Sequence, residues 1–198
     1  MKKNLKFLLL APFLMAILCE SDDDQCRSIS PEFWLDVENI SDNYNTDEII
    51  WISAEANSEL LLGCPGEDMR QVLRDGLFVL KLTNELENLN ALVVQDYDVI
   101  YEFGSAYDGS YCSEYVSYVP EYLDNELVYK FRIGISINQP GDYCLAMVRN
   151  NYFNFEQENN FEIFEPYNTL DNNVKFNRCG NTYIRYGYLD RYFLSINP

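Results

Sequence analysis

The stretch VYKFRIGISINQPGDYCLAMV, residues 128–148, decides the fold class. Every second residue from Tyr129 to Ile137 is apolar, whereas the residues between them are charged or small. This alternation predicts a strand with one buried face. Pro140 and Gly141 are set for a type II turn. Residues 143–148 are apolar on both faces, which predicts a central strand.

Similar patterns recur along the rest of the chain. Strands are predicted at 31–37, 48–56, 75–82, 91–103, 160–165, 174–179 and within 183–196. One short helix is predicted at 66–74, because acidic residues stand at its start and an apolar stripe follows them. Seven or more short strands separated by turn signals predict an all-β fold, an antiparallel β-sandwich with one short helix.

Composition limits the classes of function. The chain has 198 residues and a net charge of −18, so it repels phosphate backbones and we expect no nucleic-acid partner. It contains no histidine, which removes His-based nucleophile systems and His-ligated metal sites. We therefore expect no metal and no cofactor, and any enzyme built from this chain would depend on carboxylates, Tyr, Lys or a lone Cys.

The N-terminal segment has the pattern of an export signal. Lys2, Lys3 and Lys6 precede the apolar run Phe7–Leu18, which is shorter than the ~20 residues of a membrane-spanning helix. Residues 1–18 are therefore predicted to be a signal peptide. Residues 19–31 are polar and acidic, which predicts a flexible tether. The remaining residues, 32–198, form the predicted β-sandwich domain.

Cys19 ends the apolar run, and this arrangement resembles the lipidated cysteine of bacterial lipoproteins. Ser21, Asp22, Asp23 and Asp24 follow it and resemble the acidic export signal of Bacteroidetes-type surface lipoproteins. The resemblance implies that Cys19 becomes the first mature residue and carries palmitate-type acyl chains that anchor it in the outer membrane at the cell surface. Because Leu18 stands where a small residue is usual, the alternative is ordinary cleavage near Ser21 and a secreted product.

The cysteine count predicts disulfides. If Cys19 is lipidated, five cysteines remain, and an odd number cannot all pair. An oxidising compartment favours two bridges and one reduced thiol, in an arrangement that the sequence leaves open. The candidates are Cys26, Cys64, Cys112, Cys144 and Cys179.

Two further resemblances concern the fold. Cys144, which follows Pro-Gly-Asp-Tyr, is similar to the late-strand cysteine of immunoglobulin-like domains, although their tyrosine corner would place the tyrosine at Asp142. The C-terminal sequence CGNTYIRYGYLDRYF, residues 179–193, resembles the ends of surface lipoproteins of the Bacteroidetes. These resemblances imply an immunoglobulin-like architecture and carry no activity with them.

Three groups of residues are candidates for chemistry. Asp96, Asp98 and Glu102 share one face of the predicted strand 91–103, which predicts a solvated face, with a glycosidase-type pair or calcium as alternatives. Residues 41–48 are predicted to be a turn and, alternatively, a calcium loop. Residues 104–126 are predicted to form a long excursion from the sheets. Within it five tyrosines recur every three or four residues: Tyr107, Tyr111, Tyr115, Tyr118 and Tyr122. The spacing fits one face of a helix or an aromatic patch in a loop, and the alternative is a compositional bias toward tyrosine. Trp34 and Trp51 are predicted to lie in the core.

The sequence therefore predicts a surface lipoprotein that acts as a binding module and is not an enzyme. A protein or a glycan is the expected ligand class, and the membrane is reached through the N-terminal lipid. The alternatives are a carboxylate-based hydrolase such as a glycosidase and a structural subunit of an outer-membrane assembly.

Overall fold

The computed structural model of the chain describes a β-protein. The described residues are 33–58, 70, 73–107, 112, 114–148, 153–155, 167, 173–185 and 191–198. All of them belong to one compact unit formed by residues 30–61 and 68–198. The predicted all-β class is confirmed, and most strand pairs are antiparallel.

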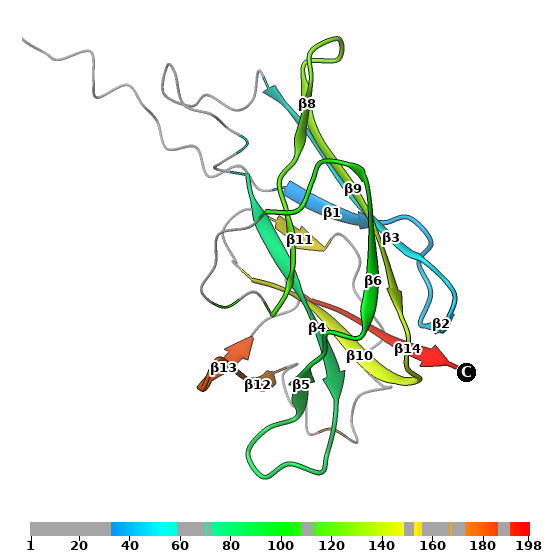
Figure 1. Cartoon of the computed structure of the whole chain (residues 1–198), viewed down its shortest axis with the longest axis vertical. Helices are drawn as coiled ribbons and strands as arrows, with labels where there is room; N and C mark the ends of the chain where they lie inside the picture. The colour runs from blue at the N-terminus through cyan, green and yellow to red at the C-terminus, as the bar shows by residue number, and fades with distance from the viewer. Residues whose placement is uncertain are drawn as a thin grey trace, which may run out of the picture. The chain divides into compact units, whose positions relative to one another are not determined.

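The strands form two large sheets and a hairpin (Figure 1). Sheet 1 has the order β11 (Phe153–Phe155), β1 (Phe33–Val37), β3 (Ile50–Asn57), β9 (Val128–Ile137) and β6 (Tyr97–Phe103), and β8 (Glu121–Leu123) also pairs with β9. Sheet 2 has the order β2 (Asn43–Asn45), β14 (Arg191–Asn197), β10 (Gly141–Met147), β4 (Asp75–Leu82) and β5 (Ala91–Val93), and β7 (Val116–Tyr118) also pairs with β4. The hairpin consists of β12 (Val174–Arg178) and β13 (Asn181–Arg185).

The main core lies between the two sheets. It combines the alternating apolar residues of β3 and β9 with Leu77 and Val79 of β4 and Tyr143, Leu145 and Met147 of β10. The alternation along residues 128–137 therefore did predict which side of β9 is buried.

Sheet 2 is buried on both faces along its central strands, β4 and β10. Its second face forms another cluster, in which Phe78, Cys144 and Phe193 pack against Val174 and Phe176 of the hairpin. Asn90 joins this hairpin to the sheet, because its side-chain amide donates to the Asn173 carbonyl over 2.9 Å and its side-chain oxygen accepts from the Lys175 amide over 2.7 Å. The predicted central strand at 143–148 is confirmed, since β10 lies between β14 and β4.

The predicted strand 91–103 is wrong as one element. β5 pairs with β4 in sheet 2, whereas β6 pairs with β9 in sheet 1. Residues 94–96 connect the two sheets, and Asp96 is held there by amide donors from Asn138 and Gln139. Polar residues at this crossing interrupt a pattern that is continuous in sequence.

Several short strands were absent from the prediction. β2 lies inside residues 41–48, which were predicted to be a turn or, alternatively, a calcium loop, and Tyr44 of β2 is fully buried. β7 and β8 lie inside the predicted excursion 104–126, and β11 was not predicted. These segments have only three residues each, which is too short for a period of two to stand out.

The predicted short helix at 66–74 lies mostly outside the described residues. Arg70 has helical backbone geometry, whereas Leu73 and Arg74 at the predicted end are non-helical and lead directly into β4. Apart from Arg70, the rest of 66–74 lies outside the described residues, as does the predicted strand 160–165. Gly141 has φ +144°, a value that L side chains rarely adopt, and this value differs from the one near +80° that a type II turn requires.

One disulfide is present among the described cysteines. Cys112 is bonded to Cys179, 67 residues later, and Cys144 is a buried thiol outside any disulfide. Cys179 and Gly180 form the two-residue turn of the hairpin with φ +47° and +82°. The bridge therefore fixes the turn of the hairpin that covers sheet 2. Cys19, Cys26 and Cys64 lie outside the described residues.

Buried tyrosine hydroxyls fix the segment between β1 and β2. The hydroxyls of Tyr44 and Tyr192 lie 3.0 Å apart, and they donate to the carbonyls of Asn39 and Ser41 respectively. Burial raises the pKa of Tyr44 and Tyr192, and it raises the pKa of Tyr118 well above 10. In the same way burial raises the pKa of Tyr143 to about 12.

The disulfide is expected to contribute substantially to stability. Closing a loop of 67 residues corresponds to about 4 kcal/mol in the chain-entropy estimate. The double variant Cys112→Ala/Cys179→Ala should lose about that much free energy of unfolding in urea, whereas Cys144→Ala should lose about 1 kcal/mol. Peptide mapping without reductant should recover Cys112 and Cys179 in one linked species, and a linkage through Cys144 would contradict the assignment.

The buried tyrosines predict a steep loss of stability at high pH. Their pKa values are raised in the fold, so their contribution is complete below about pH 10 and falls as the unfolded chain ionises above it. Each tyrosine that stays neutral in the fold should lower the free energy of unfolding by about 1.4 kcal/mol per pH unit above that point.

Urea unfolding between pH 8 and pH 11.5 measures this slope. Tyr118→Phe should reduce it, because Tyr118 is fully buried. An unchanged slope in that variant would show that Tyr118 ionises equally easily in the fold.

Candidate functional site

The outward side of sheet 1 carries the most organised group of polar and aromatic side chains among the described residues. We call it the outer face, and it consists of Asp36, Glu38, Trp51, Ser53, Glu55, Asp98, Ile100, Glu102, Lys130, Arg132 and Gly134. The alternation of β3 puts Ile50, Ile52 and Ala54 in the core and turns the residues between them outward. The same alternation turns Lys130 and Arg132 of β9 outward.

Arg132 is the centre of the outer face. Its Nε donates to Glu38 Oε1 over 2.7 Å and its Nη2 to Glu38 Oε2 over 2.6 Å, which is a bidentate pair. A third nitrogen, Nη1, forms an ion pair with Glu102 of β6. Arg132 therefore links the turn after β1 to β9 and to β6. Hydrogen bonding by Arg132 lowers the pKa of Glu38, against the opposing effect of burial.

Trp51 lies under this guanidinium. The Arg132 Cζ stands 3.9 Å from the centroid of the indole ring, within the range of a cation–π contact. Gly134 makes room for the ring, because an added Cβ would come within 2.6 Å of Ile49 Cγ2 and 3.1 Å of the indole. Trp51 is half-buried on the outer face, so the prediction that it lies in the core is wrong. The side chain of Trp34 is outside the described set.

A second cation repeats the arrangement one step along β9. Lys130 Nζ lies 3.4 Å from Glu55 Oε2 and 5.2 Å from the centroid of Phe103. Exposed ion pairs of this kind contribute little stability individually. Five carboxylates share the outer face with two cations, so the face keeps an excess of negative charge: Asp36, Glu38, Glu55, Asp98 and Glu102 against Lys130 and Arg132.

The predicted acidic group is divided by the structure. Asp98 and Glu102 are exposed on β6, while Asp96 lies before the strand, where Gln139 Nε2 donates to it over 2.7 Å. Within the described part of the chain, three metal-ligand atoms lie within 4.8 Å of one another only at Cys112, Glu114 and Cys179. Two of these are the sulfur atoms of the disulfide, so they are not available as thiolate ligands.

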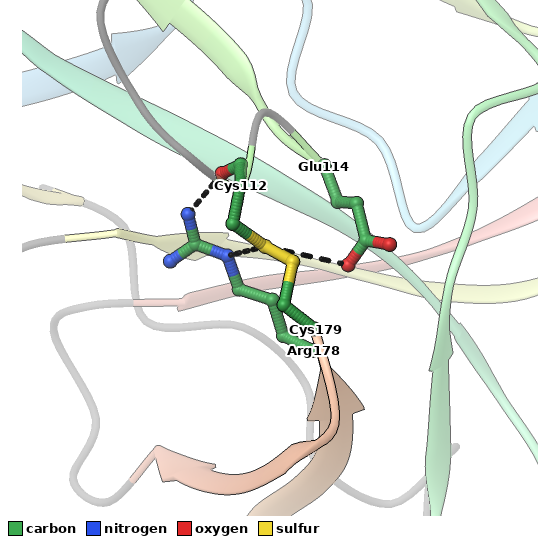
Figure 2. Close-up of a disulfide and its surroundings, with 4 residues drawn as sticks. All are labelled: Cys112, Glu114, Arg178 and Cys179. Atoms are coloured by element: carbon green, nitrogen blue, oxygen red, sulfur yellow. Dashed lines mark hydrogen bonds between the residues drawn. A yellow bond between two sulfur atoms is a disulfide. The ribbon is translucent and has the colours of Figure 1, made fainter.

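The residues around the disulfide join the hairpin β12–β13 to sheet 2 and to the segment before β7. Arg178 Nε donates to Cys112 Sγ over 3.1 Å and Arg178 also bonds the Cys112 carbonyl, while a Glu114 carboxylate oxygen lies 3.8 Å from the same sulfur (Figure 2). The Arg178 guanidinium also stacks near the rings of Phe78 and Tyr115, at 5.1 and 5.0 Å. These contacts hold the hairpin turn against sheet 2.

The predicted tyrosine series does not form one platform in the described residues. Tyr118 is fully buried on β7 and stacks on Phe131 at 4.3 Å. Tyr115 packs against the second cluster, while Tyr122 packs on Tyr129 with ring centroids 4.8 Å apart. Tyr107 lies under Arg74 at 4.4 Å, and Tyr111 lies outside the described residues.

A surface hollow lies where β6 ends and β8 begins. Among the described residues it is lined by Arg70, Gly104, Ser105, Val119, Pro120, Glu121 and Tyr122. Glu121 is the one carboxylate in this lining, so these residues do not provide the pair of carboxylates that a glycosidase needs.

Comparison with known proteins gives no relative: no family model, curated protein or solved structure matches this chain. Cys19 and the predicted export-signal residues Ser21, Asp22, Asp23 and Asp24 lie outside the described residues. Across the part that the structure describes, no helix is long and apolar enough to cross a bilayer.

Sequence reasoning did not single out the cluster around Arg132. It placed Lys130 and Arg132 on the polar side of their strand, but a sequence pattern gives no partner for either cation. The available signal was the alternation of residues 48–56, which turns Trp51 to the polar side when Ile50 and Ile52 are buried.

Arg132→Gln should raise the pKa of Glu38 toward its ordinary value and cost about 1 kcal/mol of unfolding free energy at pH 7. Because the pKa of Glu38 is lowered in the fold, this contribution is present above about pH 4.3 and is lost as the pH falls further. NMR titration of Glu38 and urea unfolding at pH 7 and pH 3 measure both effects. Lys130→Gln is the matched control, and an equal change of the Glu38 pKa in that variant would contradict the role of Arg132.

Proposed function

We propose that this protein is a lipid-anchored surface lipoprotein that acts as a binding module through the outer face of sheet 1. In this proposal Cys19 carries the acyl chains, and Ser21, Asp22, Asp23 and Asp24 direct the chain to the outside of the outer membrane. Residues 19–31 act as the tether. The order of a basic start, an apolar run, a cysteine and then acidic residues at the N-terminus supports this location.

We also propose an immunoglobulin-like architecture for the two sheets. The order β1-β3-β9-β6 in sheet 1 corresponds to strands A-B-E-D of that fold, and β4-β10-β14 in sheet 2 corresponds to C-F-G. Tyr143 at the start of β10 donates its hydroxyl to the Gln139 carbonyl over 2.9 Å, as a tyrosine corner does.

This correspondence changes the role expected for Cys144. The residue two positions after the tyrosine is Leu145, which faces the core between the sheets. Cys144 faces the other side, toward the hairpin, and forms no bridge between the sheets. β4 carries no tryptophan either. The proposed likeness therefore concerns strand order and the tyrosine, and the inter-sheet disulfide of antibody domains is replaced by aliphatic packing.

The single observation that carries the binding proposal is the difference between the two outward sheet faces. Sheet 2 is covered by the hairpin of its own chain, whereas sheet 1 presents Trp51, Ile100 and charged residues to solvent. Ile100 is 46% exposed and Glu102 47% exposed. An aromatic and an arginine surrounded by polar groups are the composition of protein-binding surfaces.

The outer face favours a protein ligand over a glycan. Sugars stack on open rings, but the guanidinium of Arg132 already lies on Trp51 and the ammonium of Lys130 lies near Phe103. A protein partner can use the charged groups themselves as contacts.

The location is tested by acyl-chain labelling of the wild type and Cys19→Ser, with and without globomycin. We expect label in the wild type, a shift to the unprocessed form with globomycin, and no label in Cys19→Ser. Label in the variant, or secreted wild-type protein without label, would refute the anchor.

The surface is tested by placing a photo-crosslinking residue at Ile100 in cells. We expect a discrete crosslinked product that Trp51→Ala removes. Leu92 on sheet 2 is the matched control position, because it is 47% exposed. Equal crosslinking from both positions would count against the outer face as the binding surface.

A further inference from the structure

The edge of sheet 1 formed by β6 has the features of a docking strand. In the two large sheets, β11, β2 and β5 at the other ends have three residues each, whereas β6 has seven (Figure 1). Natural proteins shorten edge strands because their outward amide and carbonyl groups invite pairing. β6 departs from that rule, and it pairs with β9 in a regular register from Tyr97 to Tyr101 before a bulge at its end.

The inward side of β6 is incompletely covered. Tyr97, Val99 and Tyr101 pack against the main core but remain half-buried. A strand added beside β6 would extend the sheet and cover these side chains while it paired with the backbone.

The outward side of β6 defines the chemistry of that added strand. Asp98, Ile100 and Glu102 alternate along it and are exposed. Neighbouring strands in a sheet lie about 4.7–4.9 Å apart, so the side chains of an added strand would stand directly beside Asp98, Ile100 and Glu102. Asp98 and Glu102 flank Ile100 on β6, so the complementary partner strand has two basic residues that flank an apolar residue.

Pairing with a second copy of this chain is disfavoured by the same residues. An antiparallel pair of β6 strands centred on Ile100 would place Asp98 of each copy opposite Glu102 of the other. Like charges directly opposite each other destabilise a strand pair. The outer face beyond β6 adds to this selection, because its carboxylates outnumber its cations.

We propose that β6 binds an extended segment of a partner protein by strand addition, and that the segment carries Lys or Arg at alternate positions around an apolar residue. This inference rests on the proposed binding function and specifies its partner. The main chain of β6 supplies the hydrogen bonds, Asp98 and Glu102 select the basic side chains, and the Arg132 cluster holds Glu102 in place.

The test is a selection from a displayed library of random nine-residue peptides on the purified full chain in detergent. Enriched peptides should alternate Lys or Arg with apolar residues. Asp98→Lys should bind them about tenfold more weakly, since it turns an attractive cross-strand pair into a repulsive one. Asp98→Asn, which keeps a polar side chain of the same size, should weaken them less but in the same direction.

Glu87→Lys is the matched control, because it makes the same charge change at an exposed position between β4 and β5, away from sheet 1. Equal weakening by Glu87→Lys would overturn strand addition in favour of general electrostatic attraction. Enriched peptides without basic alternation would overturn it as well.

Amide hydrogen exchange with a selected peptide locates the contact. Strand addition predicts slower exchange in residues 97–103. Peptides that quench Trp51 fluorescence but leave exchange in β6 unchanged overturn strand addition and leave the outer face as the binding surface. If the photo-crosslinking residue at Ile100 gives no crosslinked product in cells, the proposed binding function itself is refuted, whatever the result of peptide binding.

Discussion

Burial of both faces of β10 is the constraint on which the rest of the structure depends. Residues 143–147 are all buried, with Tyr143, Leu145 and Met147 on one side and Cys144 and Ala146 on the other. Two separate covers are therefore required, because a sheet with an apolar face must pack it against another element. Sheet 1 supplies one and the hairpin β12–β13 supplies the other.

The second cover is weak by itself, since an isolated two-stranded hairpin is marginally stable in water. Three kinds of contact hold it in place: the Cys112–Cys179 disulfide, the hydrogen bonds of Asn90 and the packing of Phe176 on Phe78. The bridge ends at a residue with positive φ in a two-residue turn, so it holds the turn of the hairpin to the segment before β7. Cross-linking and packing thus support the same element.

Sequence patterns predicted the strands that are long and regular. Residues 75–82 and 128–137 coincide with β4 and β9, because a buried or alternating run of eight to ten residues leaves little choice of structure. The prediction of one strand at residues 91–103 failed because periodicity does not say which sheet a strand joins. The cluster around Arg132 was not predicted for a related reason. Its other members, Glu38, Trp51 and Glu102, come from separate segments and meet only through the register of β3, β9 and β6.

An apolar sheet face must be covered and a polar one need not be, and this rule gives the outward faces of sheet 1 and sheet 2 different environments. Apolar residues on both sides of β4 and β10 require a cover from within the chain, and that cover leaves the outward side of sheet 2 occupied. β3 and β9 alternate, so their outward side is satisfied by ion pairs and cation–π contacts in water and needs no cover. In the proposed binding function, this face is stable when exposed and its described carboxylates outnumber its described cations, so a partner can meet it without any rearrangement of the core.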